Sequence, residues 1–246
     1  MKVGAPVTDI TAGILAALGV ASALFERQRT GRGRLVDTSL LEAGITQTFW
    51  QSAIALAGGG SPGPLGSAHP LSAPYQAFRT ADGWINVGAS NQGTWIALTR
   101  ALGRPGLAED ERFADNAGRM ANLEALVEVL GPLFLERASD DWLAALAAEG
   151  VPAGPIASVG EMLEHPQTIA RGMVTEVEHA TAGRVRSLGA PVKLWSVEVP
   201  PSEAVGPTGG RGAPLLGQHT RAVLHEAGLA DEEIDGLLER GDALQA

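Results

Sequence analysis

The chain has 246 residues, 45% hydrophobic and 19% charged, a balance typical of a folded protein with one large or two modest domains. Its formal net charge of −10 argues against nucleic acid or an anionic membrane surface as the main partner. It has no cysteine, which excludes disulfides, thiolate nucleophiles and cysteine-ligated metal sites and is consistent with a cytoplasmic location.

The first predicted element is a long apolar helix. Apolar residues recur at helical spacing from Ile10 to Phe25, and nearly all residues between them are small or apolar, so we expect this helix to be buried on most sides. Arg27 and Arg29 followed by Gly31 predict its end; these arginines complement the helix dipole or, alternatively, contact a phosphate. The apolar run falls short of the ~20 residues that span a bilayer, and no basic segment precedes it, which favours a soluble protein.

Asp9 stands where the irregular start of the chain meets this helix. An Asp at such a position accepts a backbone N–H as an N-cap, and the positive end of the helix dipole favours its ionised form. An ionised and positioned carboxylate also suits a nucleophile or a base. The residues alone favour capping, because most Asp residues at helix starts are caps.

A short strand is predicted at 34–39 and a second helix at 40–57. A helix, a glycine turn, a strand and a helix in this order are typical of an α/β layer. This layer is incomplete, because one strand cannot cover two such apolar helices. Five glycines and two prolines in 58–66 then predict a linker or, as a second interpretation, a mobile loop that closes over a reacting group.

The remainder predicts a compact α+β unit followed by a hairpin and two short helices. Strands are expected at 75–79 and 84–87 around the Asp82-Gly83 turn. A helix at 94–102 is capped near Asn91 or Thr94, and a helix at 140–149 has Ser139 as its N-cap. The other predictions are a helix at 123–137, an extended segment at 151–156, strands at 173–179 and 184–188, a Pro/Gly-rich connector at 200–214 and helices at 220–227 and 231–240.

Local motifs for known chemistry are scarce. The sequence contains no P-loop, dinucleotide fingerprint, zinc-binding histidine pair or nucleophile elbow. A Ser-His-Asp arrangement stays open, although we expect His165, His179, His219 and His225 to be surface or packing residues. Residue chemistry therefore leaves a soluble α/β protein with one suggestive carboxylate, Asp9.

Five motifs follow one another along essentially the whole chain, at 9–37, 68–83, 150–156, 165–166 and 214–220. Each is weak alone, but in this order they resemble the family III CoA-transferases (CaiB/BaiF type), a family that also includes the α-methylacyl-CoA racemases. The resemblance implies that 1–57 is the central part of an incomplete Rossmann-like large domain and 58–65 a linker. It further implies that 66–170 is a smaller α+β domain and that 171–246 returns to the large domain.

The resemblance also implies roles for three residues. The residue at the position of Asp9 is the central catalytic group of the family. Asp9 would therefore attack an acyl-CoA thioester to give a mixed anhydride and then an aspartyl-CoA thioester, from which CoA passes to an acceptor carboxylic acid. Gly66 and His69 lie near the family's glycine loop and become candidates for binding the CoA ester, with a hinge between domains as the alternative. Coenzyme A would be a substrate, with no metal and no permanently bound cofactor.

Partners and rival functions follow from the same resemblance. Family members carry a substantial portion before the catalytic Asp and form interlocked dimers. The expected partners are therefore a second copy or a complementing N-terminal chain, beside the small-molecule substrates, and neither nucleic acid nor membrane. A racemase would use Asp9 as a base at the α-carbon of a 2-methylacyl-CoA, and a non-catalytic truncated subunit would only bind its partner chain. We favour transfer because 75–83 and 84–91 look more like the transferase members.

Overall fold

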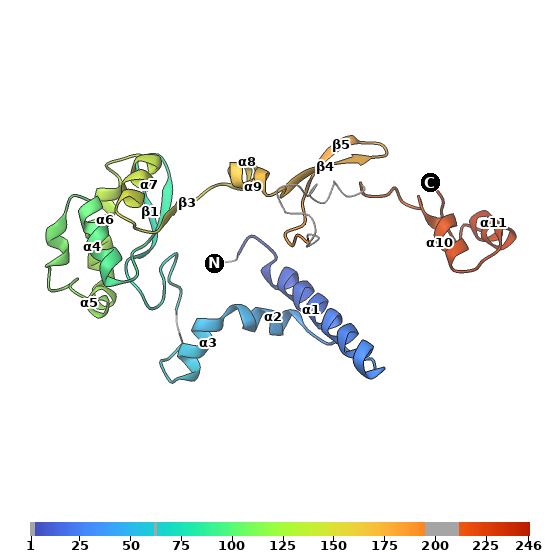
Figure 1. Ribbon diagram of the computed structural model, residues 1–246, viewed down its shortest axis with the longest axis horizontal. Coiled ribbons are helices and arrows are strands. Elements are labelled where there is room, and N and C mark those ends of the chain that lie inside the picture. Colours follow the sequence, from blue (N-terminus) through green and yellow to red (C-terminus); the bar gives the residue numbers. More distant parts are fainter. Residues whose placement is uncertain (1–2, 62, 195–211) are drawn as a thin grey trace. The chain divides into compact units, whose positions relative to one another are not determined.

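The computed structural model describes residues 3–61, 63–194 and 212–246 (Figure 1). Two compact units, Met1–Ile156 and Ala157–Ala246, divide the chain. Helices occur together with a three-stranded and a two-stranded sheet, so the predicted mixed helix-and-sheet class is confirmed.

Helix α1 (Val7–Thr30) ends where the sequence predicts. Gly31 has a φ of +70° and donates its N–H to the Arg27 carbonyl at 2.8 Å, a left-handed C-cap that glycine adopts without strain. None of the helix's side chains is buried among the described residues, so the expectation of a helix buried on most sides is wrong for this chain. The helix is also longer than predicted, at 24 residues. By length and composition alone it is the one described helix that could cross a membrane, a test that core helices of soluble proteins also pass.

The segment after α1 is extended but forms no strand. Gly19 leaves room for Val36 to lie against α1, because a Cβ on that glycine would stand 2.7 Å from Val36 Cγ1. Arg34 Nη2 also lies 2.6 Å from Glu26 Oε1 of α1, and the hydrogen bond from Arg34 lowers the pKa of Glu26. A strand needs a neighbour that completes its hydrogen bonds, and none of the described residues supplies one here. The strand predicted at 34–39 is therefore wrong.

The predicted helix at 40–57 is divided in two. Helix α2 (Leu40–Gln47) begins at Ser39, whose hydroxyl accepts the Glu42 N–H, and α3 (Phe49–Leu56) begins after a break at Thr48. The Thr48 hydroxyl bonds to the Ile45 carbonyl, so it competes with the helical hydrogen bonds at this point. Of residues 3–61, Ala43 alone is buried.

A three-stranded antiparallel sheet begins the part of the first unit that has a core. Strands β1 (Tyr75–Arg79) and β2 (Trp84–Gly88) pair with Arg79 opposite Trp84, which confirms the predicted hairpin. The extended segment predicted at 151–156 supplies β3 (Ala153–Pro155) on the other side of β2. Alternation along the strands buries Phe78, Ile85 and Val87 on one face.

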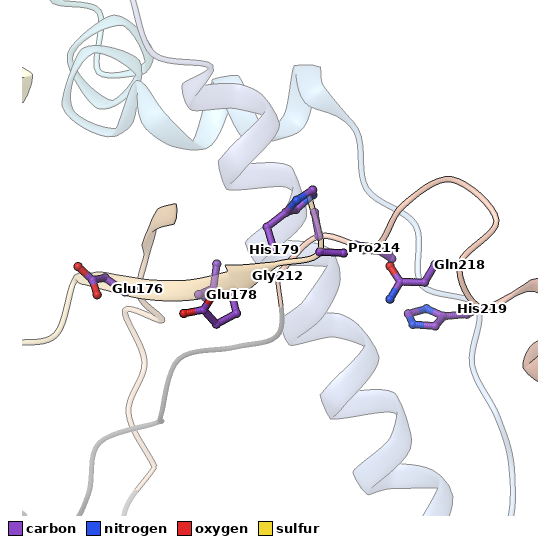
Figure 2. A pocket seen from close by; sticks show the side chains of 10 residues that line it. Glu176, Glu178, His179, Gly212, Pro214, Gln218 and His219 are labelled. Carbon is purple, nitrogen blue, oxygen red and sulfur yellow. The ribbon is translucent and has the colours of Figure 1, made fainter. Parts of the chain in front are cut away.

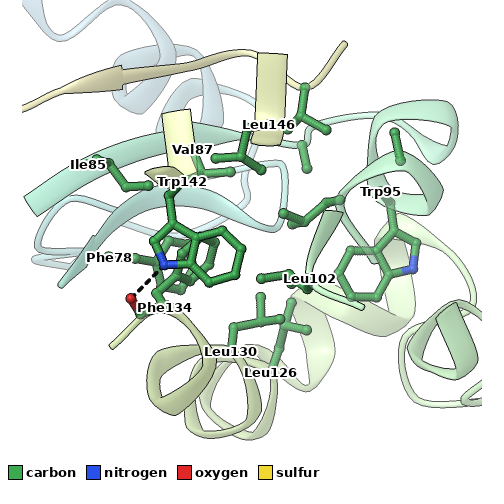
Figure 3. Packing of buried hydrophobic residues seen from close by; sticks show 14 of the residues in the cluster. Phe78, Ile85, Val87, Trp95, Leu102, Leu126, Leu130, Phe134, Trp142 and Leu146 are labelled. Carbon is green, nitrogen blue, oxygen red and sulfur yellow. Dashed lines mark hydrogen bonds between the residues drawn. The ribbon is translucent and has the colours of Figure 1, made fainter. Parts of the chain in front are cut away.

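Helices cover that face and complete the core (Figure 3). Helix α6 places Leu126, Leu130 and Phe134 four residues apart, so they share one buried stripe. Trp142 of α7 packs beside them and donates its indole N–H to the Phe134 carbonyl at 2.8 Å. The helical elements are α4 (Gln92–Ala101), η1 (Pro105–Ala108), α5 (Asn116–Ala121), α6 (Leu123–Phe134) and α7 (Ser139–Ala148).

The two predicted helix caps have different outcomes. Asn91, one of the two expected caps, is the N-cap of α4 and also forms a capping box with Thr94. Ser139 is instead the first helical residue of α7, and the preceding Ala138 offers no side-chain acceptor. Asp82 of the hairpin turn takes that role, because its Oδ1 accepts the Ser139 N–H at 2.8 Å. This backbone hydrogen bond, followed by one from the Ser139 hydroxyl, lowers the pKa of Asp82.

In the second unit the predicted hairpin and C-terminal helices are found, whereas two short helices before the hairpin were not predicted. Strands β4 (Val174–His179) and β5 (Gly183–Leu188) form an antiparallel hairpin, and both C-terminal helices are present. Residues 195–211, most of the predicted connector, lie outside the described residues. Ile234 is the one buried residue among those described in this unit. Its helices are α8 (Val159–Glu164), α9 (Pro166–Ala170), α10 (Thr220–Glu226) and α11 (Asp231–Glu239).

Arg119 of α5 is a charged side chain inside the core of the first unit, with 0% of its surface exposed. Its Nε donates to the Ala73 carbonyl at 2.6 Å, and its Nη1 donates to the Phe113 carbonyl at 3.0 Å and to Gln92 Oε1 at 3.1 Å. The guanidinium lies over the Trp95 ring, 5.2 Å from its centroid. Burial lowers the pKa of Arg119, which remains a cation at every pH where the protein is folded. Arg119 thus joins α5 and α4 to the backbone just before β1.

Replacing Arg119 should test this buried junction. We expect Arg119→Ala to lower the free energy of unfolding by about 3 kcal/mol, because two buried carbonyls lose their donor and a cavity opens beneath Trp95. Urea unfolding followed by tryptophan fluorescence measures the change. Arg104→Ala is the matched control, since Arg104 is exposed and its side chain makes no hydrogen bond to the described residues. Equal stability of the two variants would contradict the assignment.

Asp82 should make the first unit sensitive to acid. Because its folded pKa lies below the ordinary 3.8, its contribution to stability is present above pH 3.8 and is lost as the pH falls through the lowered value. We expect the urea midpoint of Asp82→Asn to fall less steeply below that pH than the wild-type midpoint. Ser139→Ala keeps the backbone hydrogen bond and should retain most of the wild-type slope. Parallel acid slopes for wild type and Asp82→Asn would refute this cause.

Candidate active site

Asp9 lies in the first turn of α1 but is not its N-cap. The helix begins at Val7 with Pro6 before it, so Asp9 is the third helical residue, and α1 has no side-chain cap. The predicted capping position is therefore wrong by three residues. Asp9 is exposed, and its Oδ2 accepts a hydrogen bond from the Thr8 hydroxyl at 3.2 Å. A carboxylate at this point stays in the positive end of the helix dipole and remains open to a reactant.

Helix α2 holds the end of α1 that carries Asp9. A Cβ on Gly44 would meet the Thr8 methyl at 3.3 Å, so that glycine permits close approach of the two helices. Gln47 Nε2 also donates to Thr11 Oγ1 at 2.9 Å. These two contacts flank Asp9 on either side in the sequence. They fix the direction of the first turn without covering the carboxylate.

His69 lies between two aromatic rings that the sequence analysis did not connect with it. Its ring stacks on Tyr75, with centroids 5.1 Å apart and planes at 3°, and it meets Trp50 of α3 edge to face at 4.8 Å. Its Nδ1 accepts the Leu71 N–H at 3.1 Å. The three residues belong to a helix, a loop and a strand and are spread over 26 positions, so no periodic pattern indicates that they meet. The one signal that the sequence offers is that the candidate His69 is followed, six residues later, by the aromatic Tyr75.

Gly66 lies three residues before His69 on the same loop. Its φ of +62° falls in the left-handed region, and a Cβ there would meet no atom within 4 Å. The backbone conformation rather than a lack of space therefore favours glycine at this position.

The described contacts link Asp9 to His69 only indirectly. Thr8 and Thr11 contact α2, α2 leads directly into α3, and Trp50 of α3 contacts the His69 ring. No hydrogen bond between described residues joins Asp9 with Gly66 or His69. The structure thus connects the neighbours of Asp9 with His69 through α2 and α3, and no described contact brings Asp9, Gly66 and His69 together.

A separate hollow of about 570 Å³ lies in the second unit (Figure 2). Glu176, Glu178, His179 and His219 contribute to its lining. Arg184 makes ion pairs of 3.3 Å with both glutamates, so their negative charges already have a cationic partner. In the described ranges no group of three or more potential metal ligands occurs. None of the predicted site residues lies here.

Comparisons with known proteins agree with this reading of the fold. A model of CoA-transferase family III matches residues 1–220. The mouse protein named succinyl-CoA:glutarate CoA-transferase is 33% identical over 94% of this chain and 51% of its own length. Acetyl-CoA:oxalate CoA-transferase of Acetobacter aceti is 33% identical over 91% of this chain and 54% of its own length. The chain belongs to CoA-transferase family III.

A solved structure gives the same result in three dimensions. The crystal structure of a CaiB/BaiF family protein from Brucella suis matches with a TM-score of 0.73 and 36% identity, over 92% of this chain and 56% of that protein. The present chain therefore spans about half the length of the relatives it matches.

Proposed function

We propose that this chain carries the catalytic carboxylate of a CoA-transferase, which moves CoA from an acyl-CoA to a carboxylic acid. The observation that carries the proposal is the exposed carboxylate of Asp9 in the first turn of α1, in a member of family III. Such a carboxylate lies at the positive end of the helix and is open to a reactant. Two of its relatives are named for transfer to glutarate and oxalate, so small dicarboxylic acids are the first acceptors to test.

The proposed reaction uses Asp9 as a covalent carrier. Its carboxylate attacks the thioester carbonyl, which forms a mixed anhydride and expels CoA thiolate. The thiolate then attacks the aspartyl carbon of this anhydride, which gives an aspartyl-CoA thioester and frees the donor acid. The acceptor carboxylate attacks that thioester, and the thiolate released in this step takes the acceptor acyl group. CoA leaves on the new acid, and Asp9 is a carboxylate again.

Gly66 and His69 are proposed to contact the CoA ester from the loop before β1. The half-buried imidazole offers a hydrogen-bond donor, and Gly66 lets the backbone approach a ligand closely. In this proposal 1–57 is the central part of the large domain, 58–65 a linker, 66–170 the small domain and 171–246 the segment that returns. Coenzyme A enters as a substrate, and the cytoplasm is the proposed location.

The exposed face of α1 supports a polypeptide partner. Ile10, Ile14 and Leu18 lie four residues apart on one stripe and are 54%, 63% and 63% exposed. Burial of each such side chain contributes roughly 1.5–3 kcal/mol, so a partner surface gains substantially by covering the stripe. The relatives contain about as much chain again as the part matched here. We propose that a complementing polypeptide, or a second copy of this chain, covers α1 in the active assembly.

Asp9→Asn should abolish transfer, because an amide cannot form the anhydride. We expect the rate to fall at least ~10³-fold when succinyl-CoA or acetyl-CoA is mixed with glutarate or oxalate and the CoA esters are followed by mass spectrometry. The matched control is Asp141→Asn, because Asp141 is likewise an exposed third residue of a helix, α7. New CoA esters from Asp9→Asn at the wild-type rate would reject the proposed carrier. Deuterium exchange at an α-carbon without CoA transfer would identify the racemase instead.

The proposal that a partner polypeptide covers α1 is tested by measuring whether the two chains associate. We expect this chain, co-expressed with the portion of the Brucella suis protein that it does not match, to elute as a complex in size-exclusion chromatography with light scattering. Leu18→Glu should prevent that complex, because it places a charge in the apolar stripe. Leu135→Glu is the control, since Leu135 is 49% exposed but lies at the end of α6. A complex that tolerates Leu18→Glu would show that α1 is not the contact.

A further inference from the structure

The rings around His69 restrict how its imidazole can lie. Tyr75 stacks on one face almost in parallel, and the edge-to-face contact with Trp50 limits rotation about the side-chain bonds. Aromatic pairs of these geometries add attraction beyond the apolar area they bury. Trp50 comes from α3 and Tyr75 from β1, so the ring is held between two separate elements.

The backbone fixes which imidazole nitrogen carries the proton. Nδ1 accepts the Leu71 N–H, and an imidazole nitrogen that accepts a hydrogen bond bears no hydrogen. The neutral ring therefore carries its hydrogen on Nε2. No described residue accepts a hydrogen bond from Nε2, which leaves this N–H free for a ligand.

The loop that supplies the Leu71 N–H is held from the core. Asn116 donates to the Leu71 carbonyl at 2.9 Å and accepts the Ala73 N–H at 3.1 Å. Arg119 binds the Ala73 carbonyl from inside. The His69 N–H also donates to the Tyr75 carbonyl at 2.9 Å, which closes the loop on itself. The donor geometry at His69 thus exists before any ligand binds.

We propose that Trp50 and Tyr75 are positioning residues that hold His69 as a fixed Nε2–H donor for a carboxylate or thioester carbonyl oxygen of the substrates. This inference rests on the proposed CoA transfer and specifies how the candidate histidine takes part in it. A neutral donor suits an oxygen on which negative charge develops when a thioester or anhydride is attacked. Because the rings and the loop set the direction of the N–H, little orientational entropy is lost on binding.

The fixed tautomer is tested on the chain itself by long-range ¹H–¹⁵N NMR of the histidine rings in mildly alkaline buffer. We expect the His69 signals, assigned by their loss in His69→Gln, to show an unprotonated Nδ1 and a protonated Nε2. Tyr75→Leu should give averaged nitrogen shifts, because the ring then turns and the Leu71 bond is lost part of the time. Tyr75→Phe keeps the stacked ring and should restore the wild-type pattern. Averaged shifts in the wild type, or an unchanged spectrum in Tyr75→Leu, would overturn the proposal.

The role towards substrate is tested by steady-state kinetics of the assembled enzyme. We expect Tyr75→Leu and Trp50→Leu to raise KM for the acceptor acid about tenfold, with a smaller change in kcat, since one hydrogen bond to the carboxylate is weakened. Trp84→Leu is the control, because Trp84 is 50% exposed in β2 and stacks on no ring among the described residues. An equal rise in KM for all three variants would show that Trp50 and Tyr75 contribute packing alone and do not position His69. Lack of transfer by the wild type would reject the proposed function, whereas the NMR spectrum still decides whether the donor is fixed.

Discussion

The uncovered apolar helix α1 is the constraint on which the first unit depends. A helix of 24 residues with no buried side chain gains little from tertiary packing in this chain, and its contacts are confined to the face that meets α2 and the extended segment through Val36. That face orients the first turn and therefore Asp9. The stripe that carries Ile14 and Leu18 remains largely exposed among the described residues. The position of the carboxylate and the proposed covering surface thus both involve α1.

The core of residues 66–156 differs from α1, because it buries its own apolar side chains and holds the loop before β1. Arg119 is buried with its charge, which is costly, and its hydrogen bonds from Nε and Nη1 offset this cost in part, since Nη2 has no partner among the described residues. Two of those bonds end on backbone carbonyls, and one of these, Ala73, lies in the loop that begins with His69. The same core that stabilises the sheet therefore holds the loop from beneath. Stability and the direction of the imidazole are coupled through one side chain.

Sequence patterns predicted those elements whose stabilising partners lie nearby in the chain. The hairpin around Asp82-Gly83, the helix cap at Asn91 and the glycine end of α1 all depend on neighbouring residues, and all are confirmed. The strand predicted at 34–39 failed because its hydrogen bonds need a partner strand that the described residues do not provide. Ser139 failed as a cap because Asp82, 57 residues away, took that role. Likewise, no spacing rule relates Trp50, His69 and Tyr75, which meet only after the sheet and α3 have formed.

The lack of a covering surface over α1 also leaves Asp9 exposed to solvent. A mixed anhydride exposed to water is open to hydrolysis, so an enzyme that uses one must exclude solvent while the CoA thiolate returns. In this chain the carboxylate is exposed, and His69 is linked to it only through α2 and α3. A surface that covers the apolar stripe of α1 would begin beside Asp9, because Ile10, the next residue, belongs to that stripe. In the proposed mechanism, burying the stripe and shielding the Asp9 carboxylate from water would then be achieved by the same contact.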